Sequence, residues 1–215
     1  MCYFFSQAEE LIKIQKRFNV DAINDLKYQP REKIIGFEFP EVPIITSESP
    51  NLLQNYYWGL IPFWVKDKET AMKLRQMTLN ARAETLFIKP AFKDSILKRR
   101  CIIPTIGFYE WQHIGKEKIP YFIHLANDEI FAFGGICDTW VNRQTGEIQN
   151  TFSIITTEAN ELMAEIHNSK KRMPLILPKE NEKDWLDDKL KINEVAEFLQ
   201  PYKSNLMKAE KIVKF

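Results

Sequence analysis

Four short segments between residues 101 and 156 constrain the fold more than any other part of the chain. They are rich in β-branched and aromatic residues and are separated by turn signals. The segments are 101–106, 121–125, 130–137 and 151–156. Gly115 and the Thr145-Gly146 pair mark two hairpins among them. The pattern predicts a mostly antiparallel sheet at the centre of an α+β protein.

Helices are expected around this sheet. The sequence Ser6-Gln7-Ala8-Glu9 has the form of a capping box, and apolar residues recur behind it at helical spacing, which predicts a helix over 7–18. Other helices are expected at 69–77, 91–99, 180–188 and 193–199, with a short one capped by Thr157. Residues 174–178 are a candidate strand, and the proline-rich stretch 40–51 is a candidate loop with an extended piece at 42–45. Nothing divides the chain, so we expect one domain over 1–215, with 180–215 as a helical appendage.

The charge balance limits the classes of partner. The 215 residues include 30 basic and 29 acidic side chains, for a net charge of +1. Such a chain has no general affinity for nucleic acids or membranes, so any DNA binding depends on a local patch. No apolar run approaches a membrane span and no signal peptide is visible, so we expect a cytoplasmic protein.

The cysteines and histidines predict neither a disulfide framework nor a metal site. The three cysteines are an odd number in a chain that is not small, and no C-x-x-C pair occurs. The three histidines are scattered along the sequence. We therefore expect no metal.

Cys2 has the most distinctive chemistry in the chain. Methionine aminopeptidases are expected to remove Met1 before this small side chain, so that the mature chain begins with Cys2. Its α-amine then has a pKa of about 7.7–8.0 and its thiol a pKa of about 8.5. An amine and a thiol on one residue suit condensation with an aldehyde to a thiazolidine, or N-terminal-nucleophile hydrolysis. The structural alternative is a small buried apolar residue.

Two motifs offer contacts to a nucleic acid. Segment 57–64 holds two tryptophans, a glycine and a proline, and Trp64 is the better candidate for stacking on bases, with core packing as the alternative. In the Asn-Ala-Arg motif, Asn80 can orient a substrate oxygen and Arg82 can hold a phosphate. A turn residue and a solvated charge are the structural alternatives for this pair.

Glu110 and His167 are the candidate proton-transfer groups. Glu110 lies among apolar residues in a predicted strand, where burial raises the pKa of a carboxyl and suits it to proton transfer. Histidine ordinarily titrates near neutral pH, so His167 could donate or accept a proton there. The basic run 170–172 faces either a phosphate backbone or solvent. A salt-bridged acid and a packed histidine are the structural alternatives.

Taken in order, these pieces resemble the SRAP (SOS response-associated peptidase) family of abasic-site-processing proteins. The resemblance runs from Cys2 to about Pro178. It rests on an initial Met-Cys, then Trp-Gly-x-x-Pro-x-Trp, Asn-Ala-Arg-x-Glu-Thr, Arg-Cys-x-x-Pro with Gly-Phe-Tyr-Glu-Trp, and Ile-His-Asn followed by Arg-Met-Pro. The implied fold is a compact α+β structure with a barrel-like sheet.

The resemblance implies covalent capture of abasic sites in single-stranded DNA without a cofactor. Cys2 would be the nucleophile, linked to the sugar aldehyde as a thiazolidine. Asn80 would orient the sugar and the N-terminus, Glu110 would help to deprotonate the amine, and His167 would open the sugar ring. The family name implies self-cleavage beside Cys2, which here removes only Met1. We expect a monomer that is associated with the nucleoid when it is bound to DNA.

The resemblance also assigns the DNA contacts. Arg82 and Arg172 would hold phosphates, Thr156 would add a hydrogen bond, and Trp64 would pack against displaced bases. Pro40 belongs to the same DNA-binding set and keeps the last position of a common Asn-x-x-Pro turn.

The sequence departs from the family pattern at two further places. Phe4 stands where many members have an arginine that could touch DNA, and Val65 stands where a second tryptophan is often found. These changes concern DNA affinity and strand geometry rather than the chemistry at Cys2.

Two other functions stay open on the sequence. An N-terminal-nucleophile cysteine hydrolase or amidase would also begin with cysteine, although such enzymes usually continue with a glycine-rich strand rather than Tyr-Phe-Phe. A non-covalent module that binds single-stranded DNA would keep its activity without Cys2.

Overall fold

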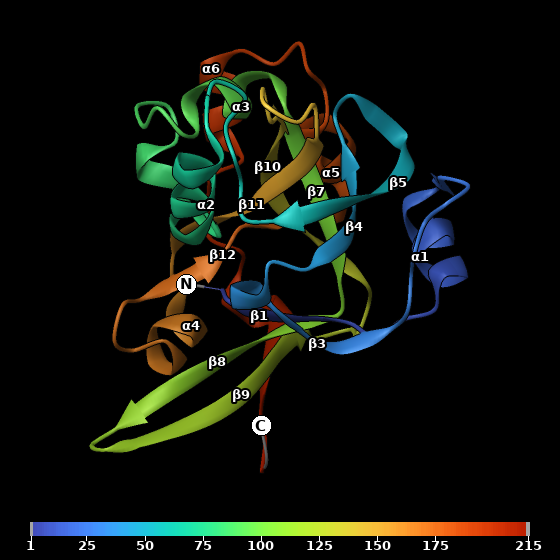
Figure 1. The fold of residues 1–215 in the computed structure, drawn as a ribbon. Coiled ribbons are helices and arrows are strands. Elements are labelled where there is room, and N and C mark those ends of the chain that lie inside the picture. The colour runs from blue at the N-terminus through green and yellow to red at the C-terminus, as the bar shows by residue number, and fades with distance from the viewer. Residues whose placement is uncertain (1, 214–215) are drawn as a thin grey trace.

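A ring of five strands forms the centre of the larger sheet (Figure 1). The computed structural model describes residues 2–213. The ring strands are β4 (Glu41–Thr46), β5 (Ser49–Trp58), β7 (Arg100–Thr105), β10 (Phe131–Val141) and β11 (Ile148–Glu158). They pair antiparallel in the order β5-β4-β7-β10-β11, and β11 also pairs in parallel with β5, which closes the ring. The predicted α+β fold with a mostly antiparallel, barrel-like sheet is confirmed.

A second, five-stranded sheet lies beside the ring in the order β14-β9-β8-β1-β3. Its strands are β1 (Phe4–Gln7), β3 (Arg31–Ile35), β8 (Gly107–Ile114), β9 (Glu117–Leu125) and β14 (Met207–Lys211). The β8–β9 hairpin projects away from the ring in Figure 1. It turns at Gly115, whose φ of 60° is the left-handed conformation that glycine adopts without strain.

Short strands and helices complete the fold. The short strands on the larger sheet are β2 (Asp21–Ala22), β6 (Asn80–Arg82), β12 (Arg172–Pro174) and β13 (Ile176–Leu177). The helices are α1 (Leu11–Phe18), α2 (Lys68–Met77), α3 (Lys93–Lys98), α4 (Glu161–Ile166), α5 (Glu182–Trp185) and α6 (Ile192–Glu197). Single 3-10 turns occur at η1 (Gly36–Glu38), η2 (Ala83–Thr85), η3 (Lys179–Asn181) and η4 (Ser204–Leu206).

Aromatic side chains fill the space between the two sheets. Trp58 stacks on Phe152 with ring centroids 6.1 Å apart and meets the edge of Phe5 at 5.2 Å. The same buried cluster includes Cys2, which is 0% exposed. The N-terminal segment is therefore part of the hydrophobic core, and this holds residue 2 in a fixed place.

The Trp-Gly motif has a structural cause. Gly59 has a φ of 107°, and a Cβ atom there would lie 2.6 Å from Cγ of Arg75. The preceding Trp58 donates from Nε1 to the carbonyl oxygen of Leu79 at 2.8 Å. This bond fixes the backbone just before Asn80, the first residue of β6.

The predicted start of the first helix is wrong. Ser6 and Gln7 lie in β1, and α1 begins at Leu11 with Glu10 as its N-cap. Gln7 donates from Nε2 to the carbonyl oxygens of Pro43 and Pro104 at 3.1 and 2.8 Å. These long-range contacts and the pairing of β1 outweigh the local capping pattern.

Three other expectations change. The stretch 40–51 is mostly strand rather than loop: the extended piece expected at 42–45 lies within β4, and a turn at 47–48 leads into β5. Pro43 is accommodated because it lies where β4 pairs with β5 alone, so no second neighbour requires its missing N–H. The cap of α4 is Asn160, whose side chain accepts from the amide of Met163 at 2.9 Å, while Thr157 lies in β11. The tail contains the expected short helices and also β14, which pairs with β9.

Candidate active site

Cys2 lies two residues before β1 and is fully buried, with its Sγ 3.8 Å from the carbonyl oxygen of Phe4. Burial raises the pKa of its thiol, and the negative charge of the nearby Glu110 raises that pKa further. The thiol is therefore protonated at neutral pH in this environment. A reaction that starts from this sulfur would first require removal of the thiol proton inside the buried site.

Asn80 holds the main chain of Cys2. β6 runs parallel to β11, with Asn80 opposite Ile154. The side chain donates from Nδ2 to the carbonyl oxygen of Cys2 at 2.9 Å, while its Oδ1 is buried and has no partner among the residues that the structure describes. A buried acceptor without a partner is unusual in a native protein and marks a candidate contact for a ligand.

Glu110 and His167 form a buried pair. Each is 6% exposed, and Glu110 Oε1 lies 3.8 Å from His167 Nδ1. Burial raises the pKa of Glu110 to about 7 and lowers the pKa of His167 to about 4. At neutral pH the imidazole is uncharged, so its contact with Glu110 is not an ion pair. His167 Nδ1 lies 2.9 Å from the carbonyl oxygen of Arg172, which favours the tautomer with its proton on Nδ1.

Asn168, to which the sequence alone assigned no role, joins the two segments that carry this pair. Asn168 donates from Nδ2 to the carbonyl oxygen of His113 at 2.8 Å and accepts from the amide of His113 at 3.1 Å. His113 lies on β8, three residues after Glu110, so these bonds join the strand of the acid to the turn of the histidine. The sequence signal that could have pointed to Asn168 was its position directly after His167 in the Ile-His-Asn motif.

A cavity of about 350 Å³ opens beside the pair. It is lined by Phe4, Glu110, Trp111, His113, Lys118, His167 and Ser169. Phe4 packs edge-on against Trp111 at 5.1 Å, so the residue that replaces the family arginine forms part of an apolar wall.

The basic candidates lie at a neighbouring cavity of about 560 Å³. Arg82 is exposed at the end of β6. Arg172 is 5% exposed and donates to Glu84 and to the carbonyl oxygen and hydroxyl of Thr156, at 2.6 and 3.3 Å for the latter two. Thr156 is itself 0% exposed. In this structure Arg172 therefore binds both Thr156 and Glu84. The place of Glu84 in the Asn-Ala-Arg-x-Glu motif carried no sequence signal of this role.

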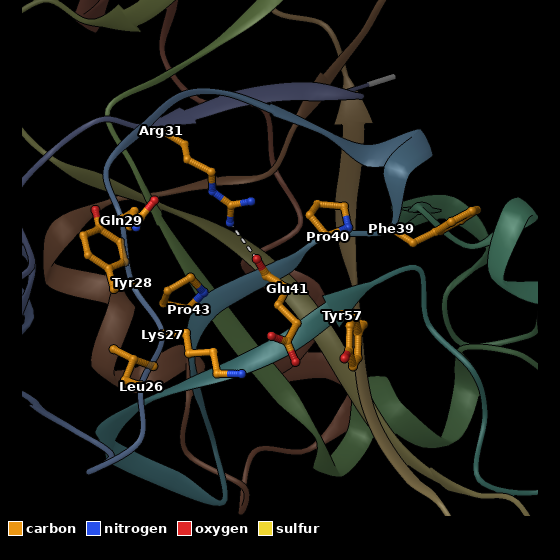
Figure 2. Close-up of a pocket in the computed structure, with 10 residues that line it drawn as sticks. All are labelled: Leu26, Lys27, Tyr28, Gln29, Arg31, Phe39, Pro40, Glu41, Pro43 and Tyr57. Atoms are coloured by element: carbon orange, nitrogen blue, oxygen red, sulfur yellow. Dashed lines mark hydrogen bonds between the residues drawn. The ribbon is translucent and has the colours of Figure 1, made fainter.

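Trp64 is not among the residues that line the cavity beside Pro40. Trp64 is 39% exposed and donates from Nε1 to the carbonyl oxygen of Pro90 at 3.3 Å, which leaves part of the indole face open. The next residue, Val65, is 1% exposed and packs in the core. Pro40 lines a different cavity, of about 800 Å³, with Phe39 beside it and Arg31 and Tyr57 on its walls (Figure 2).

Residues 2–213 contain neither a cluster of metal-binding side chains nor a helix that could span a membrane. No group of three or more His, Cys, Asp or Glu side chains in this part of the chain is arranged to hold a metal ion. No helix there is long and apolar enough to cross a membrane.

The geometry brings Cys2, Asn80, Glu110 and His167 to one place from four distant segments. A family model described as SOS response associated peptidase (SRAP) matches residues 1–214. The chain belongs to the SRAP family. The family predicted from the ordered motifs is thus confirmed.

Several SRAP relatives and structures are similar over most of the chain. Abasic site processing protein YoqW of Bacillus subtilis (strain 168) is 40% identical over 215 residues, which cover 99% of this chain and 92% of that protein. Abasic site processing protein HMCES of Gallus gallus is 35% identical over 159 residues, which cover 65% of this chain and 46% of that protein. A crystal structure of a protein from Bacteroides thetaiotaomicron matches with a TM-score of 0.92 at 43% identity, over 98% of this chain and 92% of the other.

Proposed function

We propose that this SRAP protein processes abasic sites in DNA, by capturing the ring-opened aldehyde in a single strand as a thiazolidine on Cys2. The observation that carries the proposal is the convergence of an N-terminal cysteine, an amide and a buried acid–histidine pair. The names of the relatives in Bacillus subtilis and Gallus gallus support the same substrate class. The protein would act from the cytoplasm and be associated with the nucleoid when bound to DNA.

The first step is exposure of the Cys2 amine. Met1 lies outside the described residues, and its removal, by an aminopeptidase or by the protein itself, is part of the proposal. The free amine has an ordinary pKa of about 7.7–8.0. Glu110, with its pKa raised to about 7 by burial, accepts a proton from such an amine at little free-energy cost. Asn80 holds the carbonyl of the same residue and so orients the amine.

The second step is opening of the sugar ring. This closed hemiacetal loses its hydroxyl proton and gains a proton on the ring oxygen, which yields the aldehyde. His167 exchanges these protons with the sugar, because its neutral imidazole leaves Nε2 as an acceptor when Nδ1 donates to the Arg172 carbonyl. A pair whose pKa values are pushed apart, as here, suits separate acid and base roles.

The third step joins both functional groups of Cys2 to one carbon. The amine attacks the aldehyde, and loss of water gives an imine. The thiol sulfur then bonds to the imine carbon while its proton passes to nitrogen, and the ring closes. The raised pKa of the thiol supports this order, because the amine rather than the sulfur is the first nucleophile.

The DNA contacts need no base readout, since an abasic nucleotide has no base to read. We propose that Arg82 and Arg172 hold phosphates, with Thr156 positioning Arg172 through its hydroxyl and carbonyl. The open indole face of Trp64 stacks on a displaced base, and Pro40 borders the path of the strand.

A denaturing gel tests the proposal. The purified protein, with removal of Met1 checked by mass spectrometry, is mixed with a single-stranded oligonucleotide that carries one abasic site. We expect a slow band that survives boiling in detergent, needs the abasic site, and is lost in Cys2→Ala. Cys2→Ser, which keeps the amine without the thiol, should give an adduct only after borohydride reduction of the imine. If the mature protein gives no band with or without reduction, covalent capture is wrong, and amide hydrolysis or simple DNA binding takes its place.

A further inference from the structure

The Arg172 guanidinium is already occupied by a carboxylate. Its two terminal nitrogens donate to the two oxygens of Glu84, with Nη2 to Oε2 at 3.1 Å. This forked arrangement is the one that arginine uses for a phosphate. The two side chains also differ in burial, because Arg172 is 6% exposed while Glu84 is 46% exposed.

The surroundings are otherwise suited to an anion. The cavity of about 560 Å³ is lined by the cationic side chains Arg82, Lys170, Lys171 and Arg172, together with Glu84, Glu158 and three other residues. Of the two acids, only Glu84 makes an ion pair with a described residue, and that partner is the buried arginine. Burial opposes ionisation of Glu84, but the hydrogen bond from Arg172, a backbone hydrogen bond and the charges of Arg172 and Arg82 together lower its pKa, so it is charged at neutral pH.

We propose that Glu84 is an internal competitor for the DNA phosphate at Arg172, and so a residue that determines specificity for strands that can be captured. The inference rests on the proposed function. In the free protein the carboxylate fills the guanidinium fork, and a backbone phosphate replaces it when a strand binds. The displaced carboxylate is already half exposed, so water solvates it readily.

The consequence is weak binding to intact DNA. Each strand must first displace Glu84, which lowers affinity for all single strands alike. An intact strand then dissociates quickly, whereas an abasic strand is retained by its covalent bond to Cys2. Because of this competition, the protein retains a strand through the covalent reaction with Cys2 rather than through its affinity for phosphates.

The test measures binding of an intact-base single-stranded oligonucleotide by fluorescence anisotropy over a range of salt concentrations. Glu84→Gln keeps the shape but weakens the hold on Arg172, so we expect about tenfold tighter binding, the effect of one charge-assisted hydrogen bond. The slope of log affinity against log salt should differ from the wild-type slope by less than about 0.7, the value for one phosphate contact on a single strand, because a phosphate binds Arg172 in both proteins once Glu84 is displaced. The gain in affinity should disappear when Arg172→Gln is added, and the slope should become shallower by about 0.7 because one phosphate contact is lost.

Glu158→Gln is the matched control. It removes the same charge from the same cavity but frees no arginine, so it should change affinity less than threefold, as expected for one screened surface charge. Glu84→Asp is a second variant with the charge retained, and its shorter side chain should give an intermediate gain in affinity. Thermal melting shows which variants are folded at the assay temperature.

Three results would overturn the inference. Glu84→Gln and Glu84→Asp could both bind no tighter than the wild type, Glu158→Gln could match the gain of Glu84→Gln, or the gain could persist without Arg172. Failure of the proposed function is a separate result, because it appears as a missing covalent band with abasic DNA, whereas this assay uses strands without an aldehyde.

Discussion

Asn80 and Cys2 are 78 positions apart in the sequence, and the side-chain amide of the first donates to the main-chain carbonyl of the second at 2.9 Å. That carbonyl belongs to the residue whose amine and thiol are the proposed nucleophiles. The hydrogen bond therefore limits rotation of the reacting residue before substrate arrives. The buried Oδ1 of Asn80, which has no partner among the described residues, is free to accept from the sugar or the amine.

Asn80→Ala should slow formation of the covalent adduct by about 10- to 100-fold. The variant loses the bond to the Cys2 carbonyl and leaves a buried acceptor without a donor, a loss of about 1–3 kcal/mol. The measurement is the single-turnover rate on a denaturing gel. Asn55→Ala is the matched control, since Asn55 also donates from Nδ2 to a carbonyl, that of Lys27, and also has a buried Oδ1 without a partner. Equal slowing in both variants would contradict a specific role for Asn80.

Glu110→Gln should become more stable relative to the wild type as the pH rises. The native pKa of Glu110 is about 7, above its ordinary value of 4.5, so between these values the native state holds a proton that the unfolded state has lost. Wild-type stability therefore falls as the pH rises through this window. We expect the difference in free energy of unfolding to shift towards the variant by up to about 3 kcal/mol between pH 5 and pH 8.

Chemical denaturation at several pH values measures this difference. Glu84→Gln is a useful comparison, because the native pKa of Glu84 is lowered rather than raised. Its difference from the wild type should change in the opposite direction, with stability lost from the wild type as the pH falls through the carboxyl range. A pH-independent difference for Glu110→Gln would show that its native pKa is ordinary.

His167→Gln should show the reverse trend to Glu110→Gln. The native pKa of His167 is about 4, below its ordinary value of 6.5, so between these values the unfolded state binds the additional proton. Wild-type stability therefore rises with pH across this window and is fully present above about pH 6.5. The advantage of the wild type over the variant should grow by about 1–2 kcal/mol from pH 4.5 to pH 7.5. His124→Gln, which replaces a histidine outside the site, serves as the control. If both variants show the same dependence of stability on pH, the lowered pKa assigned to His167 is wrong.

The central strands could be predicted because their signals are local. The segments around 101–106 and 130–137 are rich in β-branched and aromatic residues and are bounded by turn signals, and they form β7 and β10. Closure of the ring depends instead on the parallel contact of Thr151 with Tyr57. No local sequence pattern predicts a pairing between residues so far apart. The strand β14 was not expected for the same reason, since it forms by pairing with the distant β9.

The candidate site shows the same limit. Cys2 and Glu110 were recognisable from their chemistry and motif context, and their proximity is a structural finding while their roles stay predictions. The contact of Arg172 with Glu84 spans 88 positions and was not expected, because a charged residue in a sequence looks the same whether it is solvated or paired. Ser6 failed as a helix cap for the opposite reason, since its local pattern was clear but strand pairing prevailed.

Asn168→Ala should separate the β8 strand from the turn that carries His167. The two bonds to the His113 main chain are partly solvated, so their joint loss should lower the free energy of unfolding by about 1–2 kcal/mol. The distance between Glu110 and His167 then varies, and adduct formation should slow more than stability alone explains. Hydrogen exchange at the amide of His113 should speed up, since this amide donates to Asn168.

The conservative variant distinguishes positioning from simple stabilisation. Asn168→Asp still accepts from the amide of His113 but no longer donates to its carbonyl, so it should fall between the wild type and Asn168→Ala in both exchange and rate. Gln112→Ala is the matched control, because Gln112 also bridges β8 to α4, through the carbonyl of Glu165 at 3.1 Å. If Gln112→Ala slows adduct formation as much as Asn168→Ala, the hairpin acts through general rigidity. If only Asn168→Ala does so, the two bonds next to His167 set the geometry of the acid–histidine pair.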